Sequence, residues 1–369
     1  MEVLGFPIFI ACFGKKYLSL LFISERIKVY PHSQILSKMI TQNIDLQFAE
    51  IAQCIQKVRL KVLQRANVEL VGLYWQIGKY IQERVENAEW GKSVVKHLAE
   101  YLIDKVPESK GFSPQNLWRM KQFYEAYNAN PKLSPLVREL SWTHNCLIIN
   151  ACKTIEEKEF YLHTAFRERY TKRELERQIK SGLFERAILA DIKMPLSLKQ
   201  MPQNTENLFR DPYMLDFLNL PNRHSEKQLR DALLNHLKDF VLELGKDFLF
   251  IDKEYRIQVG DADFFIDLLF YHRGLQCLVA LELKTEKFQP ENVGQLNFYL
   301  EALDRDVRRE NENPSIGILL CKSANDEVVE YAMSRNISPT MIATYEQKLI
   351  PKQLLQKKLR ELMQWIEES

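Results

Sequence analysis

Glycine and proline are scarce in this sequence, with 12 and 14 residues among 369, about 7% against roughly 12% in average proteins. So few turn-forming residues argue against an all-β sandwich or propeller and favour long helices. A net excess of charge is also lacking, because 51 Lys and Arg residues balance 49 Asp and Glu residues to +2. This balance excludes a globally basic, histone-like binder, but it leaves room for a local basic face.

Paired cysteine motifs are absent as well. The six cysteines form no C-x-x-C pair, and Cys277 and Cys321 lie inside apolar runs. We therefore interpret the cysteines as reduced, buried, small apolar residues rather than as disulfides or a zinc knuckle. This composition predicts a cytoplasmic protein.

The N-terminal region has no apolar run of the roughly 18 residues that a transmembrane helix needs. Its apolar residues within 4–23 are interrupted by Gly-Lys-Lys at 14–16, and Glu2 stands where a signal peptide would carry basic residues. We expect no membrane association. Because a regular helical pattern begins only after Met39, we interpret residues 1–38 as a non-native upstream extension of the chain.

Residues 39–190 are predicted to form an all-α domain. From Ile44 to Val85, apolar residues recur at spacings of three and four, as on the core face of a helix. Gly72 and Gly78 in this stretch would allow close helix contacts. Further along, a serine followed by proline at 113–114 is typical of a helix N-cap and first helical position.

The composition changes after the helical region. Residues 191–222 contain four prolines and are predicted to be a linker or entry segment. Residues 223–350 then alternate helical and strand-like patterns, which predicts an α/β domain with a mixed sheet flanked by helices. A basic helix is expected at 351–369.

The informative stretch lies within residues 260–299. Asp267 interrupts an apolar run, where a lone carboxylate would be costly, and Glu282 and Lys284 share one face of the next run. If the two runs form a hairpin turning at 274–275, Asp267 lies directly opposite Glu282. Opposed side chains are about 4.5–5.5 Å apart, so both carboxylates could bind one Mg²⁺ beside Lys284.

Such a set suits phosphodiester chemistry. A bound Mg²⁺ lowers the pKa of a coordinated water and stabilises charge on phosphoryl oxygens, and a lysine can orient that water or neutralise the same charge. The alternative is a structural network of buried ions. We favour a site because Asp267, Glu282 and Lys284 interrupt apolar strands in one consistent register.

These residues carry a family resemblance. Asp267 with Glu282-Leu283-Lys284 resembles the PD-(D/E)XK nuclease core, and Gln295-x-x-x-Tyr299 resembles the extra motif of the RecB-like branch. The strings FFIDLLFYHRGLQCLVALELK, GQLNFYLEALD and SIGILLCKS, with LYWQIGKYI and GFSPQNLWRMKQFY upstream, resemble the YhcG family of bacterial proteins. The resemblance spans about residues 45–350.

The resemblance implies a restriction-endonuclease-like C-terminal domain that acts as a Mg²⁺-dependent DNA endonuclease, with Mn²⁺ as a substitute metal. Asp267 and Glu282 would be metal ligands, Lys284 the catalytic lysine, and Gln295 and Tyr299 would border the site. The alternative is a catalytically weak or inactive nuclease fold that serves as a nucleic-acid-binding or assembly module. RNA is a less favoured substrate, and homo-oligomerisation is left open.

One position departs from the family pattern. Arg230 stands where the family usually has a glutamate on the first helix of the nuclease-like domain. Glu226, one turn earlier on the same helical face, is the candidate to replace that carboxylate as a metal ligand. Its ordinary interpretation is a first-turn acid that interacts with the helix dipole.

Two groups of residues are candidates for nucleic-acid contacts. On the helix that opens at Pro114, these are Asn116, Arg119 and Lys121, because this helix could act as a recognition helix. Close after the Gln295–Tyr299 helix, a basic cluster is expected to meet phosphates near the site. It consists of Arg305, Arg308 and Arg309. The alternative for the Pro114 helix is a solvated helix face.

Overall fold

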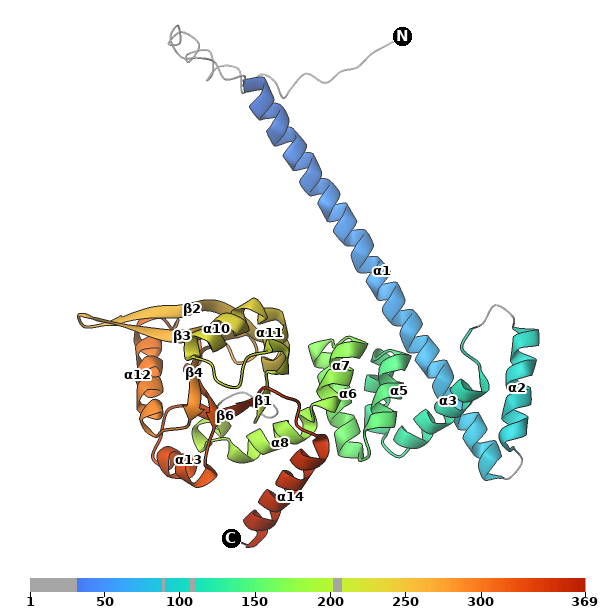
Figure 1. The fold of residues 1–369 in the computed structure, drawn as a ribbon. Helices are drawn as coiled ribbons and strands as arrows, with labels where there is room; N and C mark the ends of the chain where they lie inside the picture. Colours follow the sequence, from blue (N-terminus) through green and yellow to red (C-terminus); the bar gives the residue numbers. More distant parts are fainter. Residues whose placement is uncertain (1–31, 88–89, 107–109, 202–207, 369) are drawn as a thin grey trace, which may run out of the picture. The chain divides into compact units, whose positions relative to one another are not determined.

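The structure is a computed structural model that describes residues 32–87, 90–106, 110–201 and 208–368 (Figure 1). The chain divides into two compact units, one ending at Ala66 and the other beginning at Asn67. The prediction that residues 1–38 are a non-native extension falls mainly on residues 1–31, which lie outside the described residues. Helix α1 begins at His32.

The first half is helical, as predicted. Helix α1 (His32–Glu86) is 55 residues long. Ser113 caps α3, because its hydroxyl accepts a hydrogen bond from the Asn116 backbone N–H at 3.3 Å. The helices that follow α1 are α2 (Lys92–Lys105), α3 (Pro114–Tyr127), α4 (Ser134–Glu139), α5 (Trp142–Ala151), α6 (Ile155–Glu168), α7 (Lys172–Lys180), α8 (Leu183–Lys193) and α9 (Leu196–Lys199), with a short 3₁₀ turn at Pro131–Leu133.

Of the two glycines expected at helix contacts, Gly78 makes one and Gly72 does not. A Cβ placed on Gly78 would lie 2.1 Å from the carbonyl oxygen of Met120, so only a glycine allows α3 to approach α1 this closely. A Cβ on Gly72 would meet no atom within 4 Å. The pattern of spacing predicts both positions on a helix, but only the packing distinguishes them.

The second half is built on a six-stranded mixed sheet with the order β1-β6-β5-β4-β3-β2. Strands β2, β3 and β4 are antiparallel, and β4, β5, β6 and β1 are parallel. The strands are β1 (Tyr213–Met214), β2 (Phe248–Val259), β3 (Ala262–His272), β4 (Cys277–Lys287), β5 (Ile316–Ser323) and β6 (Thr340–Glu346).

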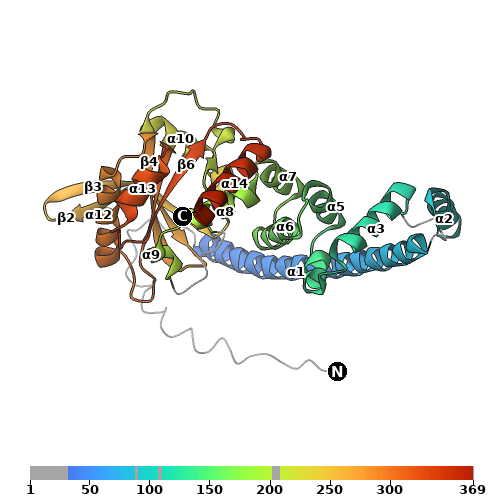
Figure 2. The same cartoon turned by 90° about the horizontal axis from the view of Figure 1, so that it is seen from below.

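Helices cover both faces of this sheet, which confirms the α/β fold class behind a helical region (Figures 1 and 2). One face packs on α10 (Glu226–Asn235) and α11 (Leu237–Leu244), and the other on α12 (Glu291–Asp306) and α13 (Asp326–Met333). The sequences of β4 and β5 contain continuous apolar runs, because parallel strands are buried on both faces of the sheet. Helix α14 (Lys352–Glu368) follows β6.

The predicted hairpin register is confirmed over the paired part of β3 and β4. Leu268 pairs with Leu281, Phe270 with Val279, and His272 with Cys277, exactly the offset that places Asp267 opposite Glu282.

Three local features of this half have no simple sequence pattern. The helical stretch after Ser225 is divided at His236 into α10 and α11. Residues 248–259 form one strand, β2, with a register shift between Phe250 and Asp252. The segment predicted as a linker or entry segment contributes β1, whose Tyr213 and Met214 pair with the edge of β6.

The cysteines are free where they are described. Cys152, Cys277 and Cys321 are buried, as expected. Cys54 is exposed, because it lies on a part of α1 whose side chains face solvent, and this corrects the prediction for that residue. Among the described helices, none combines the length and apolar character needed to cross a membrane.

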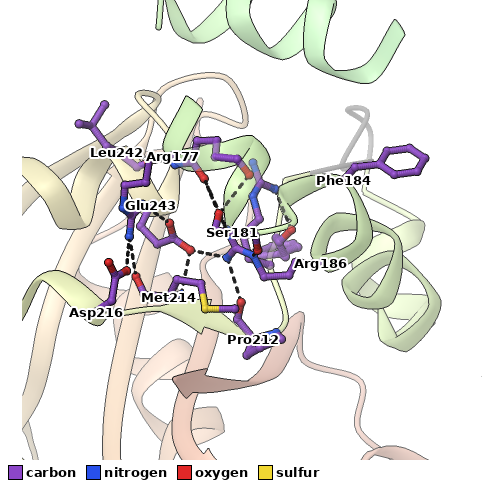
Figure 3. A network of polar contacts seen from close by, with 12 residues as sticks. Arg177, Ser181, Phe184, Arg186, Pro212, Met214, Asp216, Leu242 and Glu243 are labelled. Carbon is purple, nitrogen blue, oxygen red and sulfur yellow. Dashed lines mark hydrogen bonds and ion pairs between the residues drawn. The ribbon is translucent and has the colours of Figure 1, made fainter. Parts of the chain in front are cut away.

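A buried polar network joins the helical region to the sheet domain within the second unit (Figure 3). The Arg186 guanidinium from α8 donates hydrogen bonds to Glu243 of α11 and to the Pro212 carbonyl, the latter at 2.9 Å. Arg177 of α7 donates to the other Glu243 oxygen at 3.1 Å and to Asp216 at 2.6 Å. Charged groups from three separate segments therefore neutralise one another in the interior.

Candidate active site

The candidate site lies where β3 and β4 separate. Their ladder ends at the pair Leu268 and Leu281, and β4 continues along β5, with Glu282 beside Leu319. The Leu283 backbone N–H still donates to Asp267 Oδ2 at 2.9 Å, which ties the carboxylate of β3 to β4. Asp267, Glu282 and Lys284 therefore lie just beyond the last paired residues of β3 and β4.

Glu282 is the buried member of this pair. Its Oε1 accepts a hydrogen bond from Lys284 Nζ at 3.0 Å, and its Oε2 has no hydrogen-bond partner among the described residues. Burial and the neighbouring Asp267 carboxylate raise the pKa of Glu282 to about 7. A carboxylate with one oxygen unpaired in a desolvated place is a group that a cation would stabilise.

Lys284 lies between two carboxylates. Besides Glu282, its ammonium group is 3.7 Å from Glu226 Oε1 at the start of α10. Burial by itself would lower the pKa of Lys284, but the two carboxylates outweigh it and the pKa is raised. Lys284 is therefore held as a cation beside the acidic pair.

Gln295 and Tyr299 lie one turn apart on α12 and contact each other, with the Gln295 side-chain amide donating to Tyr299 Oη at 2.8 Å. Burial raises the pKa of the Tyr299 hydroxyl, and the charges of Glu282, Lys284 and Asp267 also affect it. The hydroxyl is thus within electrostatic reach of the three central residues. Direct contacts join Lys284 to Glu282 and Gln295 to Tyr299.

Arg230 contributes the unexpected contact. Its guanidinium, from α10, donates to Asp267 Oδ1 at 2.7 Å and to Glu254 Oε1 of β2, also at 2.7 Å. The sequence identified Arg230 as a departure from the family but did not indicate Glu254, which adopts a positive φ of 47° within a strand. The available signal was a basic residue one helical turn after Glu226, on the face that packs against the sheet.

The donor set fits a hard divalent cation through two carboxylates. Mg²⁺ is commonly held by one or two carboxylates together with water and substrate phosphate, and Glu282 Oε2 is a buried oxygen without a partner. Among the described residues, no group of three or more His, Cys, Asp or Glu side chains is arranged to hold a metal. Glu226, the candidate for a further ligand, lies with its Oε1 3.7 Å from Lys284 Nζ. The Arg230 guanidinium already donates to Asp267 Oδ1, so a cation at this oxygen would have to displace or share it.

A cavity of about 400 Å³ adjoins Lys284. Glu226 and Lys227 from the start of α10 line it together with Lys284 and Lys287 of β4. Two of these residues, Lys284 and Lys287, are basic residues of the strand that carries the candidate site. With Glu226 and Glu286 also in its lining, the cavity has mixed charge.

The candidate nucleic-acid residues on α3 are engaged within the protein. Asn116 accepts a hydrogen bond from the Trp142 indole at 2.9 Å, and Lys121 pairs with Glu125 at 2.5 Å and lies over the Trp118 ring. Arg119 is half-buried. Their contacts join α3 to α5 and to its own next turn, so Asn116 and Lys121 have structural partners independent of nucleic acid.

The basic cluster at the end of α12 and just beyond it does not lie beside Lys284. Arg308 donates to the Glu312 carbonyl at 2.8 Å, and Asn313 in the same loop bonds Gln276 in the β3–β4 turn. Residues 305–309 therefore lie at the opposite end of β4 from Lys284, since α12 runs back along the strand for about 20 Å between Gln295 and Arg308. The cluster is therefore distant from Lys284, and its contact with phosphates stays a prediction.

Comparison with known proteins agrees with the observed arrangement. A sequence-family model described as the YhcG PDDEXK nuclease domain matches residues 206–360, and one described as the DUF1016 N-terminal domain matches residues 50–186. The two halves of the chain thus resemble the two domains of the YhcG family. A relative named "Putative nuclease YhcG", from Escherichia coli (strain K12), is 29% identical over 335 residues, which cover 81% of this chain and 89% of the relative.

Two solved structures resemble parts of this chain. One, titled "crystal structure of a repair endonuclease from Pyrococcus abyssi", has 21% identity and a TM-score of 0.24 over 34% of this chain. The other, titled "Structure of EndoMS in apo form", has 19% identity and a TM-score of 0.22 over 35% of this chain. The matches span 50% and 48% of those two chains, about half of their length.

Proposed function

We propose that this protein hydrolyses phosphodiester bonds of DNA in a reaction that depends on Mg²⁺, with Mn²⁺ as a substitute. The observation that carries the proposal is Glu282, a buried carboxylate with one unpaired oxygen beside Asp267 and Lys284. The family relationship and the relative's name as a nuclease support phosphodiesters as the substrate class.

The residues divide the work of the reaction. Asp267 and Glu282 would hold the cation, which supplies a more acidic bound water and a positive charge for the phosphoryl oxygens. The Lys284 ammonium neutralises charge that develops on the phosphate and orients the attacking water. The Gln295 amide and the Tyr299 hydroxyl, already bonded to each other, border the site and position substrate or water by hydrogen bonding.

The test is cleavage of duplex, branched and single-stranded DNA, and of RNA, by the purified full-length protein with Mg²⁺ or Mn²⁺. We expect Asp267→Ala and Lys284→Ala each to lower the cleavage rate by at least about 100-fold, the range in which loss of one charge-stabilising group falls. Lys238→Ala, which removes an exposed lysine of α11, is the matched control and should retain most activity. Absence of cleavage of every DNA form, with no effect of Lys284→Ala, would overturn the proposal.

One observation favours a second candidate function. The Arg230 guanidinium occupies Asp267 Oδ1, a position that a metal would need. The alternative is therefore a nuclease fold that binds nucleic acid or assembles with other proteins without hydrolysing its ligand. Titration with Mn²⁺ discriminates the two: binding that Asp267→Ala abolishes supports the enzyme, and absence of binding supports the non-catalytic module.

A further inference from the structure

The first compact unit carries a stripe of apolar side chains exposed to solvent. Along α1, Phe48, Ile51, Ile55, Val58 and Val62 alternate at spacings of three and four residues. Each of these side chains is at least half exposed, from 54% to 62%. Among the described residues, none of them belongs to the hydrophobic clusters of the core. So large a run of exposed aliphatic and aromatic residues indicates a surface made for contact.

The spacing identifies the type of contact. Alternation of three and four is the heptad pattern of a coiled coil, in which the a and d positions form a seam against another helix. Further along the same helix, Val71, Tyr74 and Ile81 are buried in the protein's own core. The stripe at 48–62 has the same apolar character, but its side chains are exposed. A helix with a matching apolar seam would cover them.

The charge pattern points to the partner and its direction. Residues 44–50 contain two acidic and no basic residues, whereas residues 57–65 contain four basic and no acidic residues. Parallel pairing of two copies would place acidic segment beside acidic segment and basic beside basic, which is unfavourable. Antiparallel pairing of two copies places the acidic segment of one beside the basic segment of the other.

We propose that two copies of this protein associate through α1 as an antiparallel coiled coil. In an antiparallel register centred on residue 53, Phe48 of one copy packs against Val58 of the second copy, and Ile51 against Ile55. This arrangement has two-fold symmetry, so the same surface serves both copies and the assembly closes as a dimer. The DNA-cleavage proposal is independent of this dimer.

The first test measures the mass of the full-length protein in solution by light scattering and sedimentation. We expect a dimer for the wild type and a monomer for the double variant Ile51→Glu/Ile55→Glu, with a dimer dissociation constant at least about 100-fold higher. The matched control is Gln53→Glu/Gln56→Glu, which adds the same charge outside the seam and should remain dimeric. Unchanged far-ultraviolet circular dichroism verifies that the helices persist.

The second test determines the direction. In a Cys54→Ser background, Phe48→Cys and Val58→Cys are prepared as separate proteins and oxidised alone and mixed. Antiparallel pairing predicts an intermolecular disulfide only in the mixture, while the Cys54→Ser parent stays uncross-linked. Self-cross-linking of Phe48→Cys alone would overturn the antiparallel arrangement. A wild type that is monomeric up to about 100 µM would overturn the dimer itself, and so would a dimer that survives Ile51→Glu/Ile55→Glu.

Discussion

Glu282 links the stability of the metal-free protein to pH. Burial and Asp267 raise its pKa from 4.5 in the unfolded reference to about 7 in the folded state. Between these values the folded state binds more protons than the unfolded state, so the free energy of unfolding falls as the pH rises. The shift corresponds to about 3 kcal/mol at pH values above 7.

Glu282→Gln removes this titration. We expect the variant to gain stability relative to wild type as the pH is raised from 4.5 to 8, by about 3 kcal/mol in total. Urea unfolding in the absence of metal, measured at several pH values, gives the two curves. Glu301→Gln, an exposed carboxylate, is the control and should parallel the wild type. Identical pH dependence in wild type and Glu282→Gln would contradict the assignment.

Arg230 competes with a cation for Asp267. Because its guanidinium donates to Asp267 Oδ1, a metal that binds this oxygen must displace it or share it. We expect Arg230→Gln to tighten Mn²⁺ binding by about tenfold, equivalent to roughly 1.4 kcal/mol, as measured by titration calorimetry. Arg256→Gln, which removes the exposed partner of Asp263 on β2, should leave Mn²⁺ affinity unchanged. Weaker binding by Arg230→Gln would instead indicate that the guanidinium supports the metal-binding conformation.

The sequence predicted the pairing of Asp267 with Glu282, but it did not predict that Arg230 contacts Asp267 and Glu254. Asp267 and Glu282 could be aligned because hairpin register follows from the turn position and the alternation of apolar residues. The contact of Arg230 with Glu254 depends on a register shift and a positive φ in β2, and neither has a local sequence pattern. Long-range ion pairs of this type depend on how a helix packs on a sheet.

At the scale of elements, the packing of α1 on α3 depends on one missing side chain. Gly78→Ala would place a Cβ 2.1 Å from the Met120 carbonyl oxygen, so α3 must move away from α1. We expect a loss of about 1–3 kcal/mol in the free energy of unfolding, the range for overpacked interiors. Gly72→Ala, on the same helix with open space around it, should instead be neutral or stabilise by up to about 1 kcal/mol. Thermal and urea unfolding measure both, and an equal effect of the two variants would contradict the packing argument.

Elements with strong local signals were predicted well, and those defined by tertiary contacts were not. Ser113 caps α3 where the sequence predicts it, since the cap is a local hydrogen bond. The break at His236 has neither glycine nor proline to mark it. Strand β1 has only two residues, Tyr213 and Met214, and exists because they pair with β6. Periodicity cannot detect an element that short.

For the molecule as a whole, the decisive contact between the helical region and the sheet domain is an ion network around Glu243. Burial by itself would raise the pKa of this carboxyl, but the guanidinium groups of Arg186 and Arg177 outweigh it and lower the pKa. The Met214 backbone N–H also donates to Glu243, at 2.9 Å, so β1 is held by the same group. The sequence predicted residues 191–222 as a linker or entry segment and did not indicate this network. Charges that neutralise each other across 57 residues leave no local pattern.

Removing Glu243 should therefore weaken the whole second unit rather than one helix. Glu243→Ala leaves two buried guanidinium groups without their carboxylate, which costs about 3–5 kcal/mol for a buried pair. Since the folded pKa of Glu243 is lowered, its contribution is present above the unfolded pKa near 4.5 and is lost as the pH falls through the folded pKa. The difference between wild type and variant in urea unfolding should thus be full at pH 7 and shrink on acidification. The control is Glu176→Ala, which breaks an exposed pair with Lys180 and should leave the unfolding curve nearly unchanged at any pH. A pH-independent loss would mean that Glu243 acts through packing rather than charge.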